Sequence, residues 1–465
     1  MKGGYLMNVL IINGSPKGDY SVTLQTSNYL MIKFPHINFE VINVGKYIKK
    51  YEKDFSSALE KINNADLIIF SYPVYTFITP YQLHRFIELM KSSGVDFSSK
   101  IATQISTSKH FYDVTAHEFI KQNCDDMKMK YIKGLSADME DLTTEKGQKD
   151  AIKFFDYVLW SIENEYFEAP YEKREVAIVS TSEKENHEKK ELNKNVVIVT
   201  DLVENDTHLK SMIQRFTADL TANYKIINIR EYPFQGGCLG CFACTSNGKC
   251  IYKDGFDEFL RTEIQSKDAI IYAFTIKDHS MGSRFKMYDD RQFCNGHRTV
   301  TMGTPVGYII NGNYSNEPNL KMMIEGKCQV GGNYLCGVAS NEQNPDEQID
   351  RLAKTITYAM KNQLTQPSNF LGVGGMKIFR DLIYQMQGLM KADHRFFKEH
   401  GQYDFPQNKK GTIIAMYLIS SLVNNKKLMN NKKVKAKIGS NVMNEGMLMP
   451  YKKILENEKQ KQKKN

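Results

Sequence analysis

The sequence of 465 residues has no long apolar run and no cleavable leader pattern. Its longest apolar run, residues 413–423, is far shorter than the roughly 20 residues that a membrane-spanning helix needs. The early apolar stretch runs from Met7 straight into Asn13-Gly14-Ser15-Pro16, a pattern typical of a strand and turn and not of a signal peptide. We therefore expect a cytoplasmic protein without a transmembrane segment.

Most of the chain has little net charge. The overall charge is +9, but residues 409–465 carry fourteen lysines against three glutamates, a net of +11, which leaves −2 for residues 1–408. A basic tail on a near-neutral body does not indicate specific nucleic-acid binding. The tail could be solvated and disordered, or residues 413–423 could form an interfacial helix on an anionic membrane.

The cysteines are too unevenly spread for a disulfide framework. Four of the eight lie within thirteen residues, at Cys238, Cys241, Cys244 and Cys250. In a chain of this length, such grouping favours metal or redox chemistry in a reducing compartment.

Short apolar runs alternate with helix-compatible segments, and the plan occurs twice. This alternation predicts an α/β fold: two doubly wound, parallel, five-stranded sheets in tandem, with ligands at the carboxyl ends of the strands. The predicted strands are 7–13, 39–44, 65–74, 101–106 and 131–136, then 195–200, 225–229, 269–276, 305–311 and 334–339. The predicted domains are 1–167 and 195–363, joined by a charged linker at 168–194 and followed by a mixed helical, Lys-rich C-terminal extension at 364–465.

The first turn of the first domain, residues 14–23, has the composition of a phosphate-binding loop. Backbone N–H groups and a helix N-terminus both favour an anion at this point of the fold. Ser15, Ser21 and Thr23 add hydroxyl donors and Lys17 adds positive charge. A simple helix-capping turn with flexible glycines is the alternative interpretation.

The loops after the third and fourth strands complete the first site. The third strand ends in Pro73-Val74-Tyr75-Thr76, and the fourth in a polar and aromatic loop, residues 106–113. With the G-S-P-K loop, residues 7–166 resemble the flavodoxin-like NAD(P)H-dependent FMN reductases and quinone reductases. The resemblance implies FMN as cofactor and NAD(P)H as cosubstrate. The implied FMN-binding residues are Ser15, Lys17, Ser21, Thr23, Pro73, Val74, Tyr75, Thr76, Ser106, Thr107 and Ser108.

His110 and Tyr112 are candidates for donating a proton or hydrogen bond to the flavin or substrate. A lone histidine in a loop is more often idle, and hydride transfer by a flavin needs no acid–base residue.

The four cysteines define the second site. Their C-x2-C-x2-C-x5-C spacing can wrap thiolates around one centre, and spacing alone leaves zinc, an iron–sulfur cluster or a free dithiol open. Residues 195–363 resemble the iron-sulfur flavoproteins, on this run, on residues 254–259 and on a K-x-x-x-D-R segment at 286–291. That resemblance implies a [4Fe-4S] cluster on Cys238, Cys241, Cys244 and Cys250.

The second domain departs from the flavin pattern at its first loop. Residues 200–207 have no glycine and contain three carboxylates where a phosphate would lie. Like charges close together are unfavourable, so a second FMN is not expected.

The sequence thus predicts an NAD(P)H-dependent FMN oxidoreductase that passes electrons through FMN and a [4Fe-4S] cluster to a small-molecule or protein acceptor. One alternative is a two-electron quinone, nitro or azo reductase with a structural or zinc-binding second domain. Another is a non-enzymatic redox-sensing module. The chain could form a homodimer, or its two domains could supply the paired arrangement internally.

Overall fold

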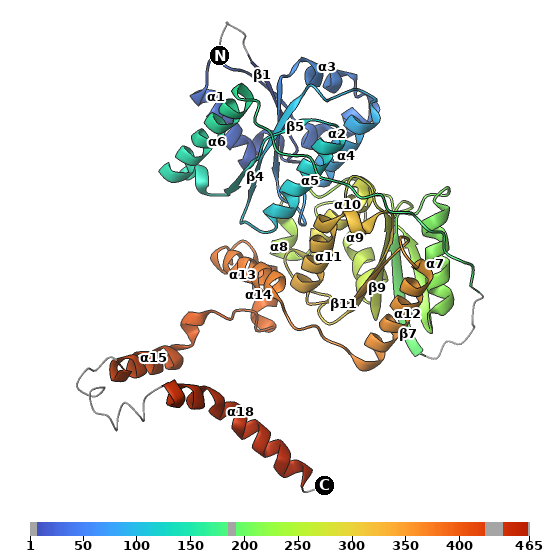
Figure 1. Ribbon diagram of the computed structural model, residues 1–465, viewed down its shortest axis with the longest axis vertical. Helices are drawn as coiled ribbons and strands as arrows, with labels where there is room; N and C mark the ends of the chain where they lie inside the picture. Colours follow the sequence, from blue (N-terminus) through green and yellow to red (C-terminus); the bar gives the residue numbers. More distant parts are fainter. Residues whose placement is uncertain (1–6, 185–191, 424–439, 464–465) are drawn as a thin grey trace. The chain divides into compact units, whose positions relative to one another are not determined.

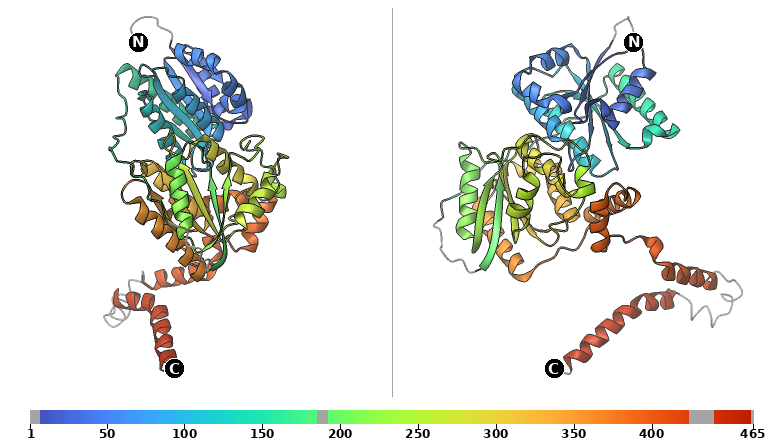
Figure 2. Two further views of the ribbon diagram at one scale, coloured as in Figure 1. Left: turned by 90° about the vertical axis from the view of Figure 1, so that its right-hand side faces the viewer. Right: turned by 180° about the vertical axis from the view of Figure 1, so that it is seen from behind.

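The computed structural model describes residues 7–184, 192–423 and 440–463 and contains two parallel sheets, each flanked by helices on both faces (Figures 1 and 2). Residues 185–191 of the predicted linker, and 424–439 and 464–465 of the basic tail, lie outside the described residues. We call residues 8–163 the first copy and residues 192–362 the second copy of the fold. The tandem doubly wound fold predicted from the alternating pattern is confirmed.

The first sheet has the strand order β2-β1-β3-β4-β5. Its central strands β1 and β3 are buried because helices cover both faces, which explains their nearly continuous apolar sequences. The predicted fifth strand is divided into β5 and β6, which both pair with β4. The strands are β1 Asn8–Asn13, β2 Asn38–Ile42, β3 Leu67–Pro73, β4 Ile101–Ser108, β5 Lys130–Tyr131 and β6 Leu135–Asp138.

The second sheet has the order β11-β10-β9-β7-β8, which is the same order once its strands are counted along the chain. Its strands are β7 Leu192–Thr200, β8 Ala222–Asn228, β9 Ala269–Thr275, β10 Pro305–Asn311 and β11 Tyr334–Ser340. Both sheets therefore present the carboxyl ends of equivalent strands as candidate ligand sites.

Helices cover each sheet in the same way. On one face, α1 and α6 pack on the first sheet and α7 and α12 pack on the second. The first-copy helices are α1 Val22–Lys33, α2 Val44–Lys53, α3 Ser56–Asn64, α4 Tyr81–Ser92, α5 Asp113–Asp126 and α6 Glu145–Glu163. The second-copy helices are α7 Thr207–Asp219, α8 Ala243–Asn247, α9 Phe256–Phe259, α10 Gly282–Arg291, α11 Pro318–Gly331 and α12 Pro345–Asn362, and a π-helical turn, Leu260–Gln265, continues α9.

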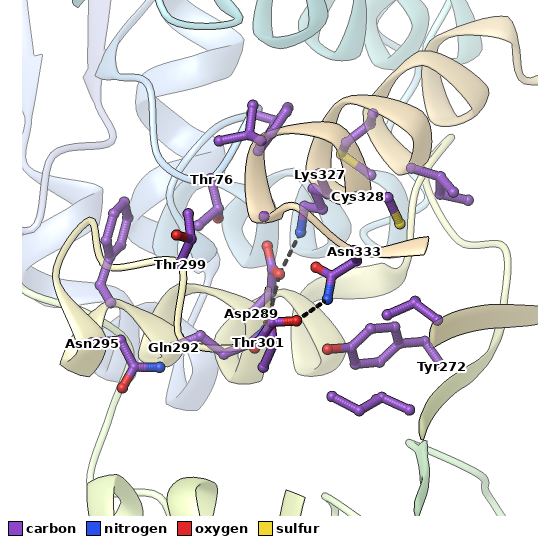
Figure 3. A pocket seen from close by; sticks show the side chains of 18 of the residues that line it. Thr76, Tyr272, Asp289, Gln292, Asn295, Thr299, Thr301, Lys327, Cys328 and Asn333 are labelled. Carbon is purple, nitrogen blue, oxygen red and sulfur yellow. Dashed lines mark hydrogen bonds and ion pairs between the residues drawn. The ribbon is translucent and has the colours of Figure 1, made fainter. Parts of the chain in front are cut away.

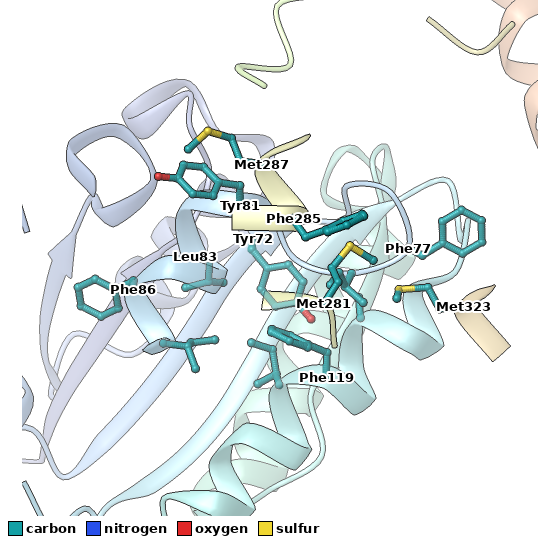
Figure 4. Close-up of a cluster of buried hydrophobic side chains, with 14 of the residues drawn as sticks. Tyr72, Phe77, Tyr81, Leu83, Phe86, Phe119, Met281, Phe285, Met287 and Met323 are labelled. Atoms are coloured by element: carbon teal, nitrogen blue, oxygen red, sulfur yellow. The ribbon is translucent and has the colours of Figure 1, made fainter. Parts of the chain in front are cut away.

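The other faces of the two sheets share one hydrophobic core, which joins the copies through α4 and α10 (Figure 4). Phe86 and Tyr81 of α4 belong to the same buried cluster as Phe285 and Met287 of α10. Since α4 and α10 follow the third strand of their respective copies, the interface pairs equivalent elements.

A carboxylate from each helix of this pair also accepts hydrogen bonds at the N-terminus of the other helix. The Asp290 carboxylate of α10 accepts a 2.7 Å hydrogen bond from the Tyr81 N–H at the start of α4. The Glu88 carboxylate of α4 accepts hydrogen bonds of 2.7 and 2.6 Å from the Ser283 N–H and Oγ at the start of α10. A carboxylate is favourable at a helix N-terminus because it meets unpaired N–H groups and the positive end of the helix dipole.

The predicted helical extension contains α13 Phe370–Gln385 and α14 Lys391–Glu399, which belong to one compact unit with both copies. Gly375 lets α13 pack closely on α11, since a Cβ there would lie 2.5 Å from Val330 Cγ2. Residues 400–465 form a separate unit with α15 Lys410–Val423 and α18 Ser440–Gln462. Among the described residues, no helix has both the length and the apolar character needed to cross a membrane.

Candidate functional site

A cavity of about 220 Å³ lies where the strand ends of the first copy meet the cysteine loop of the second copy. We call it the shared cavity. It brings together ten of the eleven predicted FMN-binding residues and all four predicted metal ligands. These are Ser15, Lys17, Ser21, Thr23, Pro73, Val74, Tyr75, Thr76, Thr107, Ser108, Cys238, Cys241, Cys244 and Cys250.

The phosphate-type loop forms one wall of the shared cavity. Ser21 caps α1, its Oγ accepting a 3.3 Å hydrogen bond from the Leu24 N–H, and the side chains of Ser15 and Thr23 are buried. The Asn13 amide fixes the loop from beneath by donating to the Gly18 carbonyl at 3.0 Å. A helix N-terminus, hydroxyl groups and the nearby Lys17 ammonium together make a site for an anion.

The Pro73-Val74-Tyr75-Thr76 segment forms a second wall through a tight turn. Tyr75 and Ile78 exchange both backbone hydrogen bonds, at 2.8 and 3.2 Å, and the two residues between them have positive φ, 40° at Thr76 and 77° at Phe77. Non-glycine residues rarely adopt such angles, which persist only when the surroundings enforce them.

A buried ion pair from the second copy enforces this turn. Lys286 of α10 donates to the Tyr75 carbonyl at 3.0 Å and to Thr76 Oγ1 at 2.6 Å, and it also pairs with Asp290. Asp290 in turn accepts from Thr76 Oγ1 at 2.6 Å. Burial raises the pKa of the Asp290 carboxyl, and the adjacent Lys286 ammonium opposes that shift. The K-x-x-x-D-R segment therefore holds a loop of the other copy.

The cysteine loop packs directly on the same turn. Gly240 has φ of +61°, and a Cβ at this position would lie 1.8 Å from Tyr75 Oη, so only glycine fits without movement. Two N–H groups donate to the sulfurs, Gly240 N to Cys238 Sγ at 3.5 Å and Arg291 Nη2 to Cys250 Sγ at 3.7 Å. Hydrogen bonds of this kind stabilise thiolates and tune thiolate-bound metal centres.

Arg291, the last residue of the K-x-x-x-D-R segment, is itself fixed in place. It makes a two-pronged ion pair with Asp254, with N···O distances of 2.8 and 2.7 Å, and lies over the Tyr252 ring at 4.4 Å from its centroid. Such planar pairing gives a buried guanidinium a fixed orientation beside Cys250.

Burial favours the protonated form of two thiols in this loop. Burial raises the pKa of Cys238, and burial with the nearby Asp393 raises the pKa of Cys244 to about 11. A fifth thiol, Cys294, also lines the cavity, and burial raises its pKa to about 12. These thiols would lose their protons on binding a metal.

The sulfurs are not gathered as tightly as a single-ion site requires. Among the described residues, three potential ligand atoms lie within 4.8 Å of one another only at His84, Glu88 and Asp278. A tetrahedral zinc centre would hold its four sulfurs about 3.8 Å apart. No three of the described cysteine sulfurs lie within 4.8 Å of one another, so they do not form a preformed single-ion site.

Three predicted residues do not line the shared cavity. Ser106 Oγ bonds to His117 Nε2 at 2.8 Å, and His110 Nδ1 pairs with Asp113 at 2.8 Å in a half-exposed position. Tyr112 Oη donates to the Leu371 carbonyl at 3.2 Å, and its ring packs on Phe77.

Sequence reasoning missed several residues of the cavity wall. Phe111, Phe293 and His297 line it, as does a group from α13: Ile378, Phe379 and Leu382. His297 Nδ1 bonds at 3.0 Å to the buried carboxylate of Asp393 on α14. Only Phe111 had a signal in the sequence, since it lies in the aromatic loop after the fourth strand.

In the second copy, the position that corresponds to the anion site is occupied by a side chain of that copy, Asp206. Asp206 caps α7 by accepting from the Leu209 N–H at 3.1 Å, and it also accepts from Asn311 Nδ2 at 3.0 Å and from Thr275 Oγ1. Its carboxylate thus takes the place that an anionic ligand would need.

Comparisons with known proteins agree with this fold. A family profile described as a flavodoxin-like fold matches residues 7–126. An iron-sulfur flavoprotein of Clostridioides difficile (strain 630) is 25% identical over 203 residues, which is 40% of this chain and 87% of that protein.

Solved structures that match part of this chain include an NADH:FMN oxidoreductase in its apo form, 17% identical, with a TM-score of 0.30, covering 33% of this chain and 89% of that one. An NAD(P)H:quinone oxidoreductase from Methanothermobacter marburgensis is 13% identical, with a TM-score of 0.29, covering 38% of this chain and 100% of its own. The class that fold and sequence define is a protein with tandem flavodoxin-like α/β domains.

Proposed function

We propose that this protein is an NAD(P)H-dependent flavin oxidoreductase that binds FMN in the shared cavity. The observation that carries the proposal is the composition of that cavity, in which an anion-binding helix N-terminus, a strained strand-end turn and four thiols face one space. When bound, FMN supplies hydride transfer and can exchange electrons with one-electron carriers.

The residues of the first copy fit the parts of FMN. The N-terminal turn of α1 with Lys17, Ser21 and Thr23 would hold the phosphate. The turn at 73–76 and the residues Thr107 and Ser108 would contact the flavin ring, since these strand ends border the same cavity. The aromatic side chains of Phe111 and Phe379 would exclude water from it.

The thiols of Cys238, Cys241, Cys244 and Cys250 would hold a [4Fe-4S] cluster within reach of the flavin. The soft donor set and the N–H···S hydrogen bonds support this assignment. The similarity to an iron-sulfur flavoprotein supports it too. The cluster would carry single electrons between the flavin and a small-molecule or protein acceptor.

We assign proton delivery to His297. Its Nδ1 is fixed by Asp393, and its ring borders the shared cavity. This arrangement orients the imidazole toward the cavity wall, as a general acid requires. A two-electron reduction of a carbonyl or quinone consumes a proton, which His297 would donate.

Anaerobic purification followed by flavin, iron and sulfide analysis tests the proposal. We expect one FMN per chain and about four irons per chain, with broad iron–sulfur absorbance beneath the flavin bands. Cys241→Ser should lose the iron and keep the FMN, whereas Cys336→Ser, in β11 and outside the shared cavity, should keep both.

Other results of the flavin and iron analysis would contradict part or all of the proposal. FMN without iron would overturn the cluster, and zinc in its place would favour a two-electron quinone, nitro or azo reductase with a structural second domain. Protein that binds neither FMN nor iron would overturn the whole proposal.

A further inference from the structure

A second cavity of about 220 Å³ lies mainly between elements of the second copy and is also bordered by Thr76, Phe77 and Phe111 of the first copy (Figure 3). We call it the inner chamber. Its walls come from β9, β10, α10 and α11 and are mainly aromatic and apolar. They include Tyr272, Phe274, Phe285, Tyr308, Met281 and Met323. Aromatic walls favour a planar, apolar ligand.

Among the polar groups of the chamber wall is an ion pair that can orient such a ligand. Lys327 of α11 pairs with Asp289 of α10 at its wall, and Figure 3 shows the two side chains directed toward each other. Asp289 is 6% exposed, so little water competes for this pair. Lys327 has further N–H groups to offer beside the one that meets Asp289.

Charges near this point balance, which decides the charge of the ligand. Around Lys327, the two ammonium groups of Lys286 and Lys327 are accompanied by the two carboxylates of Asp289 and Asp290. A carboxylate ligand would add an unpaired buried charge, which is unfavourable. A neutral ligand with a carbonyl oxygen would accept from Lys327 without disturbing the balance.

The chamber is small and adjoins the proposed flavin site. A molecule of one or two rings fits within its volume of about 220 Å³. Five residues border both cavities: Thr76, Phe111, Phe293, His297 and Phe379. The proposed proton donor His297 therefore borders both spaces.

We propose that the inner chamber binds a neutral aromatic carbonyl compound of one or two rings, with its carbonyl oxygen hydrogen-bonded to Lys327. Its role as the acceptor site rests on the proposed flavin function, but binding itself does not. The second copy would then supply the acceptor site as well as the thiols.

Calorimetric titration with 1-tetralone and with tetralin tests this proposal. The two probes have the same rings and differ by one carbonyl oxygen, and neither alkylates thiols. We expect 1-tetralone to bind at least about tenfold more tightly, because only 1-tetralone can accept a hydrogen bond from the charged Lys327 side chain. Lys327→Met should remove this preference, Lys327→Arg should retain part of it, and Lys321→Met, exposed on the same helix, should retain all of it.

Three results would overturn the proposal: equal affinity for both probes in the unaltered protein, no binding of either probe, or displacement of FMN by 1-tetralone. The titrations are performed on protein with and without FMN. Carbonyl-selective binding to a protein that never takes up FMN would retain the chamber and refute the proposed flavin function. The comparison of probes in the unaltered protein stays decisive even if Lys327→Met fails to fold.

Discussion

The two copies share strand order, helix placement and a strained turn, but they differ at the N-terminus of their first helix. The first copy has a candidate anion site there, and the second copy does not. In the first copy Ser21 caps α1 and leaves a hydroxyl-lined cavity beside Lys17. In the second copy Asp206 caps α7 and fills the equivalent space with its own carboxylate. The residue that caps this helix is thus a hydroxyl beside a cavity in the first copy and a carboxylate bonded within its own copy in the second.

The strained turn of each copy is held by a hydrogen bond to the other copy. Thr76 and Phe77 in the first copy, and Asp278 and His279 in the second, have positive φ at equivalent places. Thr76 bonds to Asp290 of the opposite copy, and His279 bonds to Asp126 of the opposite copy. Contacts across the interface therefore stabilise both turns, and the first of them borders the shared cavity.

The largest expected effect comes from removing the ion pair that only the second copy provides. Lys286→Met would leave Asp290 buried and unpaired, which should lower the free energy of unfolding by about 3–5 kcal/mol. Urea denaturation measures this, with Lys354→Met, exposed on α12, as the control. A loss under about 1 kcal/mol would contradict the anchoring role of Lys286.

Exchanging the helix caps tests the difference between the copies directly. Ser21→Asp can still cap α1 but brings a carboxylate to the anion site, so we expect FMN to bind at least about a hundredfold more weakly. The free energy of unfolding should change by less than about 1 kcal/mol. Fluorescence titration of FMN measures the affinity, and Ser21→Asn, a neutral capping residue, is the control. Unaltered affinity in Ser21→Asp would locate the phosphate elsewhere.

The reverse change should have a smaller effect. Asp206→Ala removes the cap of α7 and the bonds to Thr275 and Asn311, and should destabilise the protein by about 1–2 kcal/mol in thermal or urea denaturation. Asp206→Asn should retain most of the stability. Neither change should create a second flavin site, because no lysine like Lys17 lies in that loop. Two FMN per chain in Asp206→Ala would contradict this interpretation.

The smallest expected effect is a pH dependence at the interface. Burial opposes protonation of His279, but its bonds to Asp126 and Glu317 prevail and raise its pKa. A raised histidine pKa contributes stability below the unfolded value near 6.5, and this stability is lost as the pH rises through the folded pKa.

As the pH rises above 6.5, the free energy of unfolding should therefore fall less in His279→Gln than in the unaltered protein. Denaturation at a series of pH values measures this difference. The other charged groups around this histidine are Lys91, Lys173 and Asp278, and all three are kept in the variant. His208, at the start of α7 and outside this cluster, offers the control His208→Gln. Equal pH profiles for His279→Gln and the unaltered protein would refute the claim that titration of His279 makes the stability depend on pH.

Local patterns were enough to predict the strands and the strand-end residues, because turn composition and strand periodicity are short-range properties. Ser21 and Tyr75 could be chosen from their loops alone. The role of Lys286 could not, since it depends on how two folded copies dock. Phe379 and His297 reach the cavity wall through the packing of α13 and α14, for which no short motif exists.

The reciprocal capping of α4 and α10 has a consequence for how the site assembles. In a protein made of two separate subunits, dilution would dissociate the subunits and separate the two sides of such an interface. Here a covalent tether keeps both partners at a high effective concentration, so the site forms by a first-order process. We expect the shared cavity to be complete in a single chain at any protein concentration, with walls that cannot be exchanged between molecules.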